Sequence, residues 1–503
     1  MITTQYKEEL LQVLADLVEE LDVPPSKYED AKSRYEAVRN WLNGDGSDLA
    51  QYVPAIYAQG SFALGTAVKP LGDDHYDVDA VCRLEASSNS ITQEQLKELV
   101  GRRLKAHKTY EKMLDPKEGG RRCWTLKYSD DSRFHLDILP AVPDNPAWLT
   151  AQGVPAAIAE HAICITDRET WGTSSDWPKS NPQGYVTWFK DRMRVILEER
   201  RVVLAKAVGA EVQDIPDYKV QTPLQQVIKL LKRHRDKMYI GDDDKPISII
   251  ITTLAARAYN NQGDLFDALL AIVPGMRNSI ENRNGVWWIE NPVNPEENFA
   301  DKWNETPRKQ EVFFEWLDAL EREHHELVGD PGFRSVGYRL AESYGQREAE
   351  SVIKKYAART GKTVPSLTSS LVLSKFVVPH RQAPQWPVVL QYKVEIRARA
   401  WRKGWRTLNF ANGSAAIPKD HSLKFFAKTK VPPPFEVSWQ VVNTGEEARR
   451  ANQLRGDFYP GEGNDGLERK ENTKYKGMHW IECFIIKDGN CVARSGEFVV
   501  NIK

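Results

Sequence analysis

Apolar residues at helical spacing mark the beginning of the chain. Between residues 5 and 22 they recur every three or four positions, and Pro24-Pro25 ends the pattern. We therefore expect a helix over residues 5–22 and a second helix from Pro25 to Leu42. The apolar positions of the first helix are Leu10, Leu11, Val13, Leu14, Leu17, Val18 and Leu21.

Four later segments have the alternation or the apolar content of strands. They lie at about 53–58, 76–84, 122–128 and 133–139. We expect these segments to form a mixed sheet, with the two N-terminal helices packed behind it. A helical lobe should follow, from about residue 185 to 360.

The pattern changes around residues 361–385. The run from Gly361 to Pro365 and the serines after it are typical of a linker. The remainder of the chain combines β-forming residues, aromatic residues and turn signals such as Asp488-Gly489. We place a domain boundary at the linker and expect a compact β-dominated domain after it.

Composition limits the class of protein. With 503 residues and 41% hydrophobic content, the chain is long enough for two or three domains. No apolar run approaches the roughly 20 residues of a transmembrane helix, and the N-terminus lacks the apolar region of a signal peptide. We therefore expect a soluble, cytoplasmic protein. The formal net charge of −1 makes long duplex DNA a poor default activator.

The cysteines point to neither a disulfide framework nor a zinc site. Their number is odd, and none has CxxC spacing. We expect them to be small buried residues. They are Cys82, Cys123, Cys164, Cys483 and Cys491.

The candidate chemistry lies in three short motifs. Gln59-Gly60-Ser61-Phe62 is followed by Asp77-Val78-Asp79 and then by Phe134-His135-Leu136-Asp137-Ile138-Leu139-Pro140. Residues two apart on a strand point to the same face, so Asp77 and Asp79 project together, and Asp137 can join them from a neighbouring strand. Such carboxylates repel, because two unit charges about 4 Å apart cost about 4 kcal/mol at an effective dielectric constant near 20. Divalent cations that prefer oxygen ligands would remove that repulsion.

Each motif alone has an ordinary explanation, since Gly-Ser is common in turns and Asp-x-Asp at solvated strand ends. The ordered set favours a catalytic site, because a carboxylate such as Asp137, flanked by apolar residues, is costly to bury without a partner. Gly60 lets the backbone approach a phosphate, whose oxygens backbone N–H groups and the Ser61 hydroxyl can hold. We therefore predict a metal-dependent nucleotidyl-transfer site with Asp77 and Asp79 among its ligands.

A basic stretch follows between residues 223 and 236. Its apolar residues form one helical stripe, and Lys229 and Lys232 belong to a cationic face. Such a face suits the wall of a phosphate site, and a solvated surface helix has the same pattern. Ser248 precedes an apolar, β-branched run, so it is a helix N-cap, a phosphate contact or both.

With these residues the chain resembles the polymerase-beta-like nucleotidyltransferases. Among them it is similar to the bacterial relatives of cyclic GMP-AMP synthase and oligoadenylate synthase, the CD-NTases, which make nucleotide second messengers. The resemblance covers about residues 1–350. Its further motifs are Ser180-Asn181-Pro182-Gln183-Gly184-Tyr185, Pro223-Leu224-Gln225, Leu230-Leu231-Lys232-Arg233-His234-Arg235-Asp236, Lys245-Pro246-Ile247-Ser248-Ile249-Ile250 and Asn291-Pro292-Val293-Asn294-Pro295-Glu296-Glu297-Asn298-Phe299.

The resemblance implies that Asp77, Asp79 and Asp137 are the catalytic and metal-binding residues. They would hold Mg²⁺ or Mn²⁺, and Asp137 would also help to activate the acceptor hydroxyl. The substrates would be nucleoside triphosphates. The animal synthase of this superfamily carries a zinc insertion for DNA sensing, and this sequence has no Cys/His cluster that could form one. We therefore expect no zinc-dependent DNA sensing.

The resemblance also implies a set of residues that hold the triphosphate. Lys229 lies on nearly the same helical face as one of them, one turn earlier, so the choice between the two lysines stays open. The implied nucleotide-binding residues are Gln59, Gly60, Ser61, Lys232 and Ser248.

The C-terminal part resembles a second module. Residues 435–445, 479–482 and 497–500 look like the adenylyl/guanylyl cyclase and SMODS-associated sensor domain that some of these synthases carry. Several aromatic and polar residues there would line a ligand or peptide groove, or else belong to the core and turns of a β-sandwich. They are Trp439, Asn443, Arg455, Asp457, His479 and Trp480.

The predicted fold class is α+β, with a polymerase-beta-like nucleotidyltransferase sheet, a helical lobe and a C-terminal β-rich domain. We expect the catalytic domain at residues 1–180 and the helical lobe, which completes the nucleotide site, at 181–360. A linker would follow at 361–385 and the β-rich sensor domain at 386–503.

The predicted reaction is attack of a ribose hydroxyl on the α-phosphate of a nucleoside triphosphate, with release of pyrophosphate. Its repetition would give a cyclic di- or oligonucleotide second messenger. By resemblance, the signal would act in bacterial antiviral (anti-phage) defence through a separate effector protein, and an unidentified activator would act through residues 386–503. Two alternatives stay open: a synthase of linear oligonucleotides or a nucleotidyltransferase acting on RNA or protein ends, and an inactive nucleotide-binding sensor.

Overall fold

The structure is a computed structural model. It forms two compact units, residues 1–331 and 332–503. Most of the predicted linker, residues 361–379, lies outside the described residues, so the boundary placed there stays a prediction. The described residues are 4–44, 46–71, 75–128, 134–172, 176–214, 220–329, 339–341, 343–360, 380–382, 384–402, 404, 407–412, 416–443, 447–448, 451, 453–463 and 465–502.

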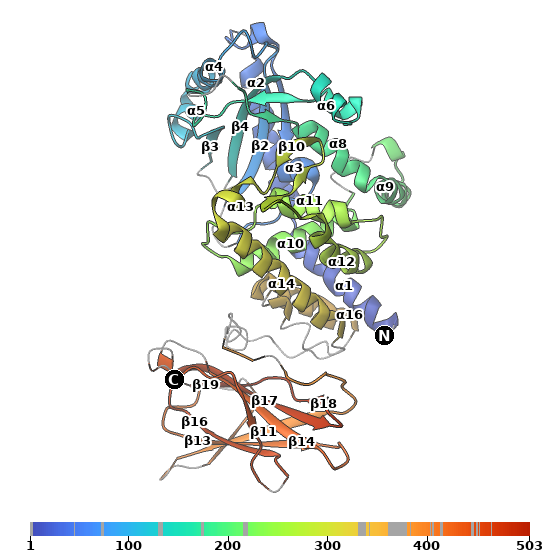
Figure 1. Cartoon of the computed structure of the whole chain (residues 1–503), viewed down its shortest axis with the longest axis vertical. Coiled ribbons are helices and arrows are strands. Elements are labelled where there is room, and N and C mark those ends of the chain that lie inside the picture. Colours follow the sequence, from blue (N-terminus) through green and yellow to red (C-terminus); the bar gives the residue numbers. More distant parts are fainter. Residues whose placement is uncertain are drawn as a thin grey trace. The chain divides into compact units, whose positions relative to one another are not determined.

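The first unit is built around one mixed sheet (Figure 1). β1 (Ala55–Gln59) runs antiparallel to β2 (Tyr76–Arg83), and β2 runs parallel to β4 (Phe134–Pro143). The four strands expected from the sequence are present, with ends shifted by a few residues. The other strands of the sheet are β3 (Trp124–Lys127), β5 (Ile163–Ile165) and β6 (Lys179–Ser180).

Strand alternation gives this sheet two different faces. Even-numbered residues of β2 and β4, such as Val78 and Leu136, join an apolar core with α2 (Pro25–Asn43) and α4 (Gln93–Lys105). Odd-numbered residues of the same strands point to the opposite face. The predicted helix that begins at Pro25 therefore packs behind the sheet, as expected. The other face carries a smaller apolar cluster around Val81 and Leu139 beside the polar side chains of the two strands.

The first helix lies elsewhere than the sequence pattern predicts. α1 (Thr4–Leu21) packs against α10 (Pro223–Met238) and α12 (Leu265–Gly275), so its predicted place behind the sheet is wrong. Its apolar stripe is buried, and Lys7 forms a salt bridge with Asp267 at 2.7 Å near the start of α12. An amphipathic pattern requires an apolar partner but does not say which one, and here the lobe supplies it.

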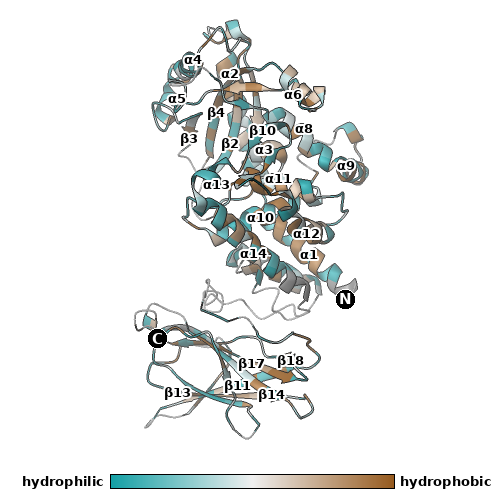
Figure 2. Cartoon of the chain, viewed as in Figure 1, coloured by the Kyte–Doolittle hydropathy of each residue, from teal (hydrophilic) through white to brown (hydrophobic). Residues whose placement is uncertain are grey.

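The helical lobe completes the first unit. α10, α11 (Ser248–Ala258) and α12 pack against one another, and Figure 2 shows α11 and α12 as predominantly hydrophobic. Among the described residues, none of the helices has both the length and the apolar character needed to cross a bilayer. The remaining elements of this unit are α3 (Gly60–Leu64), α5 (Lys108–Met113), α6 (Ala147–Ala151), α7 (Ala156–Ala159), α8 (Pro182–Arg192), α9 (Arg194–Val208), α13 (Asp301–Glu305), α14 (Pro307–Gly329), β7 (Glu281–Arg283), β8 (Val286–Trp288), β9 (Glu290–Asn291) and β10 (Asn294–Asn298).

The second unit contains α16 (Gln346–Thr360) and two antiparallel sheets. One sheet has the order β12-β11-β13-β16, and the other has the order β15-β14-β17-β18, with β19 also paired to β17. Trp439, Phe425 and Phe498 belong to an apolar core shared by both sheets, so the predicted β-rich domain and the α+β class are confirmed. The strands are β11 (Val394–Trp401), β12 (Leu408–Phe410), β13 (Ser422–Thr429), β14 (Glu436–Asn443), β15 (Phe458–Pro460), β16 (Glu468–Asn472), β17 (Gly477–Lys487), β18 (Asn490–Arg494) and β19 (Phe498–Ile502).

Six aromatic and polar residues of the second unit were predicted to line a groove or else to belong to the core and turns. In the structure they serve mainly in packing and in turns. Trp439 and Trp480 are 0% and 2% exposed. The Asn443 side-chain oxygen accepts the Arg455 backbone N–H at 2.6 Å, and the Arg455 guanidinium pairs with Glu471 at 2.7 Å. The β-sandwich alternative is the one that the structure supports.

Candidate active site

The three predicted carboxylates lie on neighbouring strands. In the parallel ladder of β2 and β4, Asp79 pairs with Asp137, and Asp77 pairs with His135. These side chains point away from the core, because alternating neighbours such as Val78 fill it. The structure thus brings all three acids to one face of the sheet.

The Gly-Ser turn lies directly against one of these acids, Asp79. Gln59 ends β1 and pairs with Asp79 across the antiparallel ladder. Gly60 has a φ of +65°, and a Cβ atom there would lie 2.1 Å from Asp79 Oδ2. No side chain fits at that distance, so this position requires glycine for its backbone conformation and for its close approach. Ser61 follows as the second residue of α3.

Lost hydration and mutual repulsion raise the pKa of Asp79. Burial is the main cause, followed by the charges of Asp137 and Asp77, and together they raise the pKa to about 7. The pKa of Asp77 is also raised, mainly by lost hydration; His135 opposes that shift and Asp137 adds to it. The Asp77 side chain is nevertheless 75% exposed, so solvent still reaches its carboxylate within this crowded region. The site holds more negative charge than its surroundings compensate.

Two neighbouring side chains engage the carboxylates. Thr125 on β3 is the ladder partner of Asp137, and its Oγ1–H donates to Asp137 Oδ1 at 2.5 Å. His135 Nδ1 lies 3.6 Å from Asp77 Oδ1, and the His75 ring stacks on the His135 ring at 4.4 Å. Sequence reasoning missed Thr125 and His75. The register of β3 against β4 is the signal that identifies Thr125.

The donor set suits a hard divalent cation. The carboxylates of Asp77, Asp79 and Asp137 share one face of the sheet. The charges of Asp77 and Asp137 raise the pKa of Asp79, and Gly60, which has no side chain, leaves space next to the Asp79 carboxylate. In the described part of the chain, however, no three acidic, histidine or cysteine side chains are gathered closely enough to hold a metal as they stand. Asp137 and Asp77 are turned instead toward Thr125 and His135.

The cationic helix α10 is buried, so the solvated-face alternative is wrong. Lys229, Lys232, Arg233 and Arg235 are 1% to 7% exposed. Each has a partner within the unit: Lys229 pairs with Asp22, and the Arg233 guanidinium donates to the Lys69 backbone oxygen at 2.7 Å. Packing of α10 among α1, α11, α12 and α14 covers the face that a cationic pattern alone assigns to solvent.

Lys232, rather than Lys229, reaches the Gly-Ser turn. Its Nζ donates to Thr66 Oγ1 at 3.0 Å, and the Thr66 N–H donates to the Ser61 backbone oxygen at 2.9 Å. Burial lowers the pKa of Lys232 to about 7, and Arg235 adds to this shift, whereas Asp79 opposes it. The lysine therefore senses the charge of the acidic cluster.

Gln225 joins α10 to the same turn. Its side-chain oxygen accepts the Thr222 N–H at 2.9 Å in a capping box that begins the helix, and its Nε2 donates to the Leu64 backbone oxygen at 2.9 Å. Gly65 has a φ of +66°, and a Cβ there would lie 2.5 Å from Gln225 Nε2. One side chain thus begins α10 and holds the end of the turn that contains Ser61.

Ser248 does not cap its helix. Ile247 occupies the N-cap position of α11, and Ser248 is the first helical residue, so the N-cap interpretation is wrong. The Ser248 Oγ lies 3.4 Å from both Nη atoms of Arg235. Its predicted triphosphate contact stays a prediction, because the structure joins Ser248 to Arg235 rather than to the acids.

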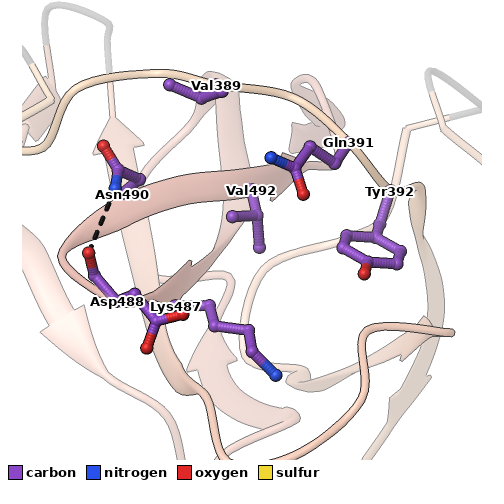
Figure 3. Close-up of a pocket in the computed structure, with 7 residues that line it drawn as sticks. All are labelled: Val389, Gln391, Tyr392, Lys487, Asp488, Asn490 and Val492. Atoms are coloured by element: carbon purple, nitrogen blue, oxygen red, sulfur yellow. Dashed lines mark hydrogen bonds between the residues drawn. The ribbon is translucent and has the colours of Figure 1, made fainter.

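A separate pocket of about 180 Å³ lies in the second unit (Figure 3). Sites for drug-sized ligands usually measure about 300–1,000 Å³, so this pocket is too small for a nucleoside triphosphate. Lys487 at its edge already donates to the Pro432 backbone oxygen at 2.6 Å. We assign it no ligand. Its lining residues are Val389, Gln391, Tyr392, Lys487, Asp488, Asn490 and Val492.

The burial of the cysteines agrees with the expectation for all but one of them. All five are free, and four are buried, whereas Cys123 is partly exposed. Burial raises the pKa of Cys123 to about 12, with smaller contributions from Asp137 and Asp79. Cys123 therefore lies close to the acids as a neutral thiol.

Comparisons with known proteins place both units in characterised families. Residues 9–192 match the Second Messenger Oligonucleotide or Dinucleotide Synthetase domain, and residues 376–503 match the Adenylyl/Guanylyl and SMODS C-terminal sensor domain. A c-di-GMP synthase of Roseivirga ehrenbergii is 30% identical over 363 residues, which cover 71% of this chain and 89% of that protein. The cyclic dinucleotide synthase CdnG of Bradyrhizobium diazoefficiens is 27% identical over 384 residues, covering 72% and 86%.

Solved structures show the same fold. The Bradyrhizobium diazoefficiens CD-NTase CdnG, determined in complex with GTP, matches with a TM-score of 0.54 and 24% identity over 69% of this chain and 99% of that chain. The resemblance found in the sequence is therefore confirmed for both units. The chain belongs to the bacterial CD-NTase family of nucleotidyltransferases and carries a C-terminal sensor domain of the adenylyl/guanylyl cyclase and SMODS-associated type.

Proposed function

We propose that this chain is a metal-dependent synthase that joins nucleoside triphosphates into a cyclic dinucleotide second messenger. The observation that carries the proposal is the close approach of Gly60 to Asp79, whose strand pairs with that of Asp137, because a turn of the kind that can hold phosphate lies against one of the acids. The two relatives, named c-di-GMP synthase and cyclic dinucleotide synthase, support the same reaction, and the chain spans 89% and 86% of their lengths.

The turn and the lobe would hold the triphosphate between them. The backbone at Gly60 and the Ser61 hydroxyl would contact its oxygens, with Gln59 and Ser248 as further contacts. Lys232 lies behind the turn with a pKa of about 7. A bound triphosphate would raise that pKa, because a nearby anion favours the charged lysine, and the lysine would then offset part of the phosphate charge.

The acids would hold the metal ions. Asp77, Asp79 and Asp137 are the proposed ligands of Mg²⁺ or Mn²⁺. Two such ions stabilise the attacking and the leaving oxygens of an in-line displacement. The raised pKa of Asp79 supports this assignment, because the repulsion that raises it is the repulsion that a bound cation would relieve.

The proposed reaction is a phosphoryl-centred displacement. The ribose hydroxyl oxygen of one nucleotide forms a bond to the α-phosphorus of another, and the bond from that phosphorus to pyrophosphate breaks. Asp137, which Thr125 holds at 2.5 Å, is the group proposed to receive the hydroxyl proton. A second displacement between the joined nucleotides would close the ring.

The proposed biological role is bacterial anti-phage signalling. It rests on membership of the CD-NTase family and on the appended sensor domain. A diffusible cyclic product would act on a separate effector protein, and the sensor domain would control when the product is made.

The test is a product assay on the purified full chain. Radiolabelled ribonucleoside triphosphates, Mg²⁺ and Mn²⁺ are supplied, and the products are treated with phosphatase and identified by mass spectrometry. The double variant Asp77→Asn/Asp79→Asn should retain its fold, checked by circular dichroism, and should lose all turnover. A phosphatase-resistant cyclic dinucleotide made by the native chain alone supports the proposal.

Two results would contradict it. Normal turnover in the folded double variant would contradict the assignment of Asp77 and Asp79 as metal ligands. Label retained on added RNA or on protein, with no small cyclic product under activating conditions, would show instead that the chain is a nucleotidyltransferase acting on macromolecules.

A further inference from the structure

The sheet β12-β11-β13-β16 of the second unit has one face toward solvent. Its inward residues, such as Ala398, Leu423 and Phe425, are buried in the core shared with the other sheet. The residues between them point outward by strand alternation. Arg397 and Arg399 on β11 are both exposed.

The outward face carries a row of like charges. The register pairs Arg399 with Lys424 and Lys424 with Lys470, so three cations stand side by side on three adjacent strands. Like charges directly opposite each other destabilise a sheet, so the row does not serve folding. Arg397 and Lys428 extend it in the neighbouring rows.

Few carboxylates offset this charge. Lys424 pairs with Glu468 at 2.7 Å, and Lys470 lies 3.7 Å from Glu462. Within the described residues, Arg399 has no ion pair. The five outward cations of the three strands face two outward carboxylates, Glu395 and Glu468, in a chain whose formal net charge is −1. Positive charge is thus concentrated on this face.

Aromatic rings lie among the cations. The Arg399 guanidinium and the Lys424 ammonium lie 4.8 and 4.9 Å from the centroid of the Phe426 ring. Phe426 is cross-strand to Arg397, and Trp401 points outward two residues beyond Arg399; both rings are half-buried. Phe426 and Trp401 lie outside the sandwich core, and the Phe426 ring, with the Arg399 and Lys424 heads over it, combines an aromatic surface with positive charge.

We propose that this basic sheet face binds single-stranded nucleic acid and is the ligand-binding surface of the sensor domain. We define the face by Arg397, Arg399, Lys424, Phe426, Lys428 and Lys470. The cations would contact backbone phosphates, and unpaired bases would stack on the rings, which is how open sheets bind single strands.

Other ligands fit the face less well. The bases of a duplex are already stacked on each other, so they cannot use the rings. An acidic peptide that extends a sheet binds along an edge through backbone hydrogen bonds and would leave the central row of cations unused. The proposal goes beyond the synthase activity, because it concerns the second unit alone.

The experiment is fluorescence anisotropy with the full chain and a short, labelled, mixed-sequence single-stranded RNA, without nucleotide substrates. Arg397→Gln/Arg399→Gln should weaken binding and should reduce the slope of log K against log salt by about 1.4, because each lost phosphate contact removes about 0.7. Phe426→Leu should weaken binding by roughly tenfold and leave that slope unchanged. Lys108→Gln/Lys112→Gln, on the exposed surface of α5, is the charge-matched control and should bind like the native chain.

The outcomes decide the proposal. Tight binding of the single strand, weaker binding of the matching duplex and loss in the two face variants support it. Equal binding by the face variants and the control, no binding by the native chain, or displacement of the RNA by polyglutamate at equal charge overturns it. Because no product is measured, these results leave the synthase proposal untouched.

Discussion

Both units place like charges on adjacent strands as ladder partners, negative charges in the first unit and positive charges in the second. In the first unit, Asp79 and Asp137 are ladder partners on parallel strands. In the second, Arg399, Lys424 and Lys470 are ladder partners on antiparallel strands. Both arrangements oppose folding and are only partly compensated within the chain, so in our proposals the remaining charge would be offset by metal cations at the acids and by phosphates at the basic face.

The difference lies in burial. Asp79 loses most of its hydration, and its pKa rises to about 7. The cations of the basic sheet face are mostly exposed. A crowded cluster in which one carboxylate has lost much of its hydration favours a small cation, whereas an exposed row gives a weaker, salt-dependent attraction for a long polyanion.

The largest effect should come from the glycine beside the acids. Gly60→Ala places a methyl group 2.1 Å from Asp79 Oδ2, so the carboxylate or the turn has to move, and the synthesis rate should fall by at least about 100-fold. Gly153→Ala is the matched control: its φ is +87°, but no atom lies within 4 Å of the added Cβ. Equal activity of the two variants would contradict the proposed contact of turn and acids.

The next effect concerns the two lysines of α10. Lys232→Met should raise KM for the nucleoside triphosphate by roughly tenfold, because it would remove the positive charge that we propose to lie behind the phosphate-binding turn. Lys229→Met should leave KM unchanged and lower the free energy of unfolding, because it breaks the buried pair with Asp22. Steady-state kinetics and urea unfolding of both variants separate these roles. A shared change in KM would place both lysines at the nucleotide.

The third effect is a pH dependence in metal-free protein. The folded-state pKa of Asp79 is about 7 and the unfolded value about 3.9, so the folded state binds the proton more tightly. Stability should therefore fall as pH rises from about 4 to about 7, by at most about 1.4 kcal/mol per pH unit from this group. Urea unfolding with a chelator should show a smaller fall in Asp79→Asn. Parallel curves for the two proteins would contradict the raised pKa.

The smallest effect tests the row of cations. Arg399→Glu turns the pair with Lys424 into opposite charges without breaking an ion pair among the described residues, and should stabilise the protein by about 0.5 kcal/mol. Lys428→Glu is the opposite case: its ladder partner is Glu395, so the variant creates a like-charge pair and should destabilise by a similar amount. Thermal unfolding at low salt measures both. Shifts of the same sign would mean that these pairs do not interact through charge.

Strand alternation made the acidic site predictable. The spacing of Asp77 and Asp79 and the apolar neighbours of Asp137 are local properties of the sequence, and they fixed which side chains share a face. The contact of Thr125 with Asp137 and the row across Arg399 depend on register between strands, which a single sequence does not specify.

Predictions for the helices failed where burial depends on tertiary packing. A cationic helix is usually solvated, and only the partners of α10, such as Asp22 for Lys229, show why its charges are buried. The place of α1 against the lobe was missed for the same reason. Ser248 was misassigned as a cap by one position, which is the usual uncertainty of helix ends.

The hydrogen bond from Gln225 to Leu64 has a consequence for how the protein is made. The two residues are 161 positions apart, so the turn leaves the ribosome long before the side chain that holds it. Because chains are synthesised from the N-terminus at about 5–20 residues per second, the nascent turn lacks its hydrogen bond to Gln225 for roughly 10–30 seconds. The proposed nucleotide site would therefore be complete only after the lobe has been synthesised, and a chain truncated before Thr222 would carry every acid but not the side chain that anchors the turn.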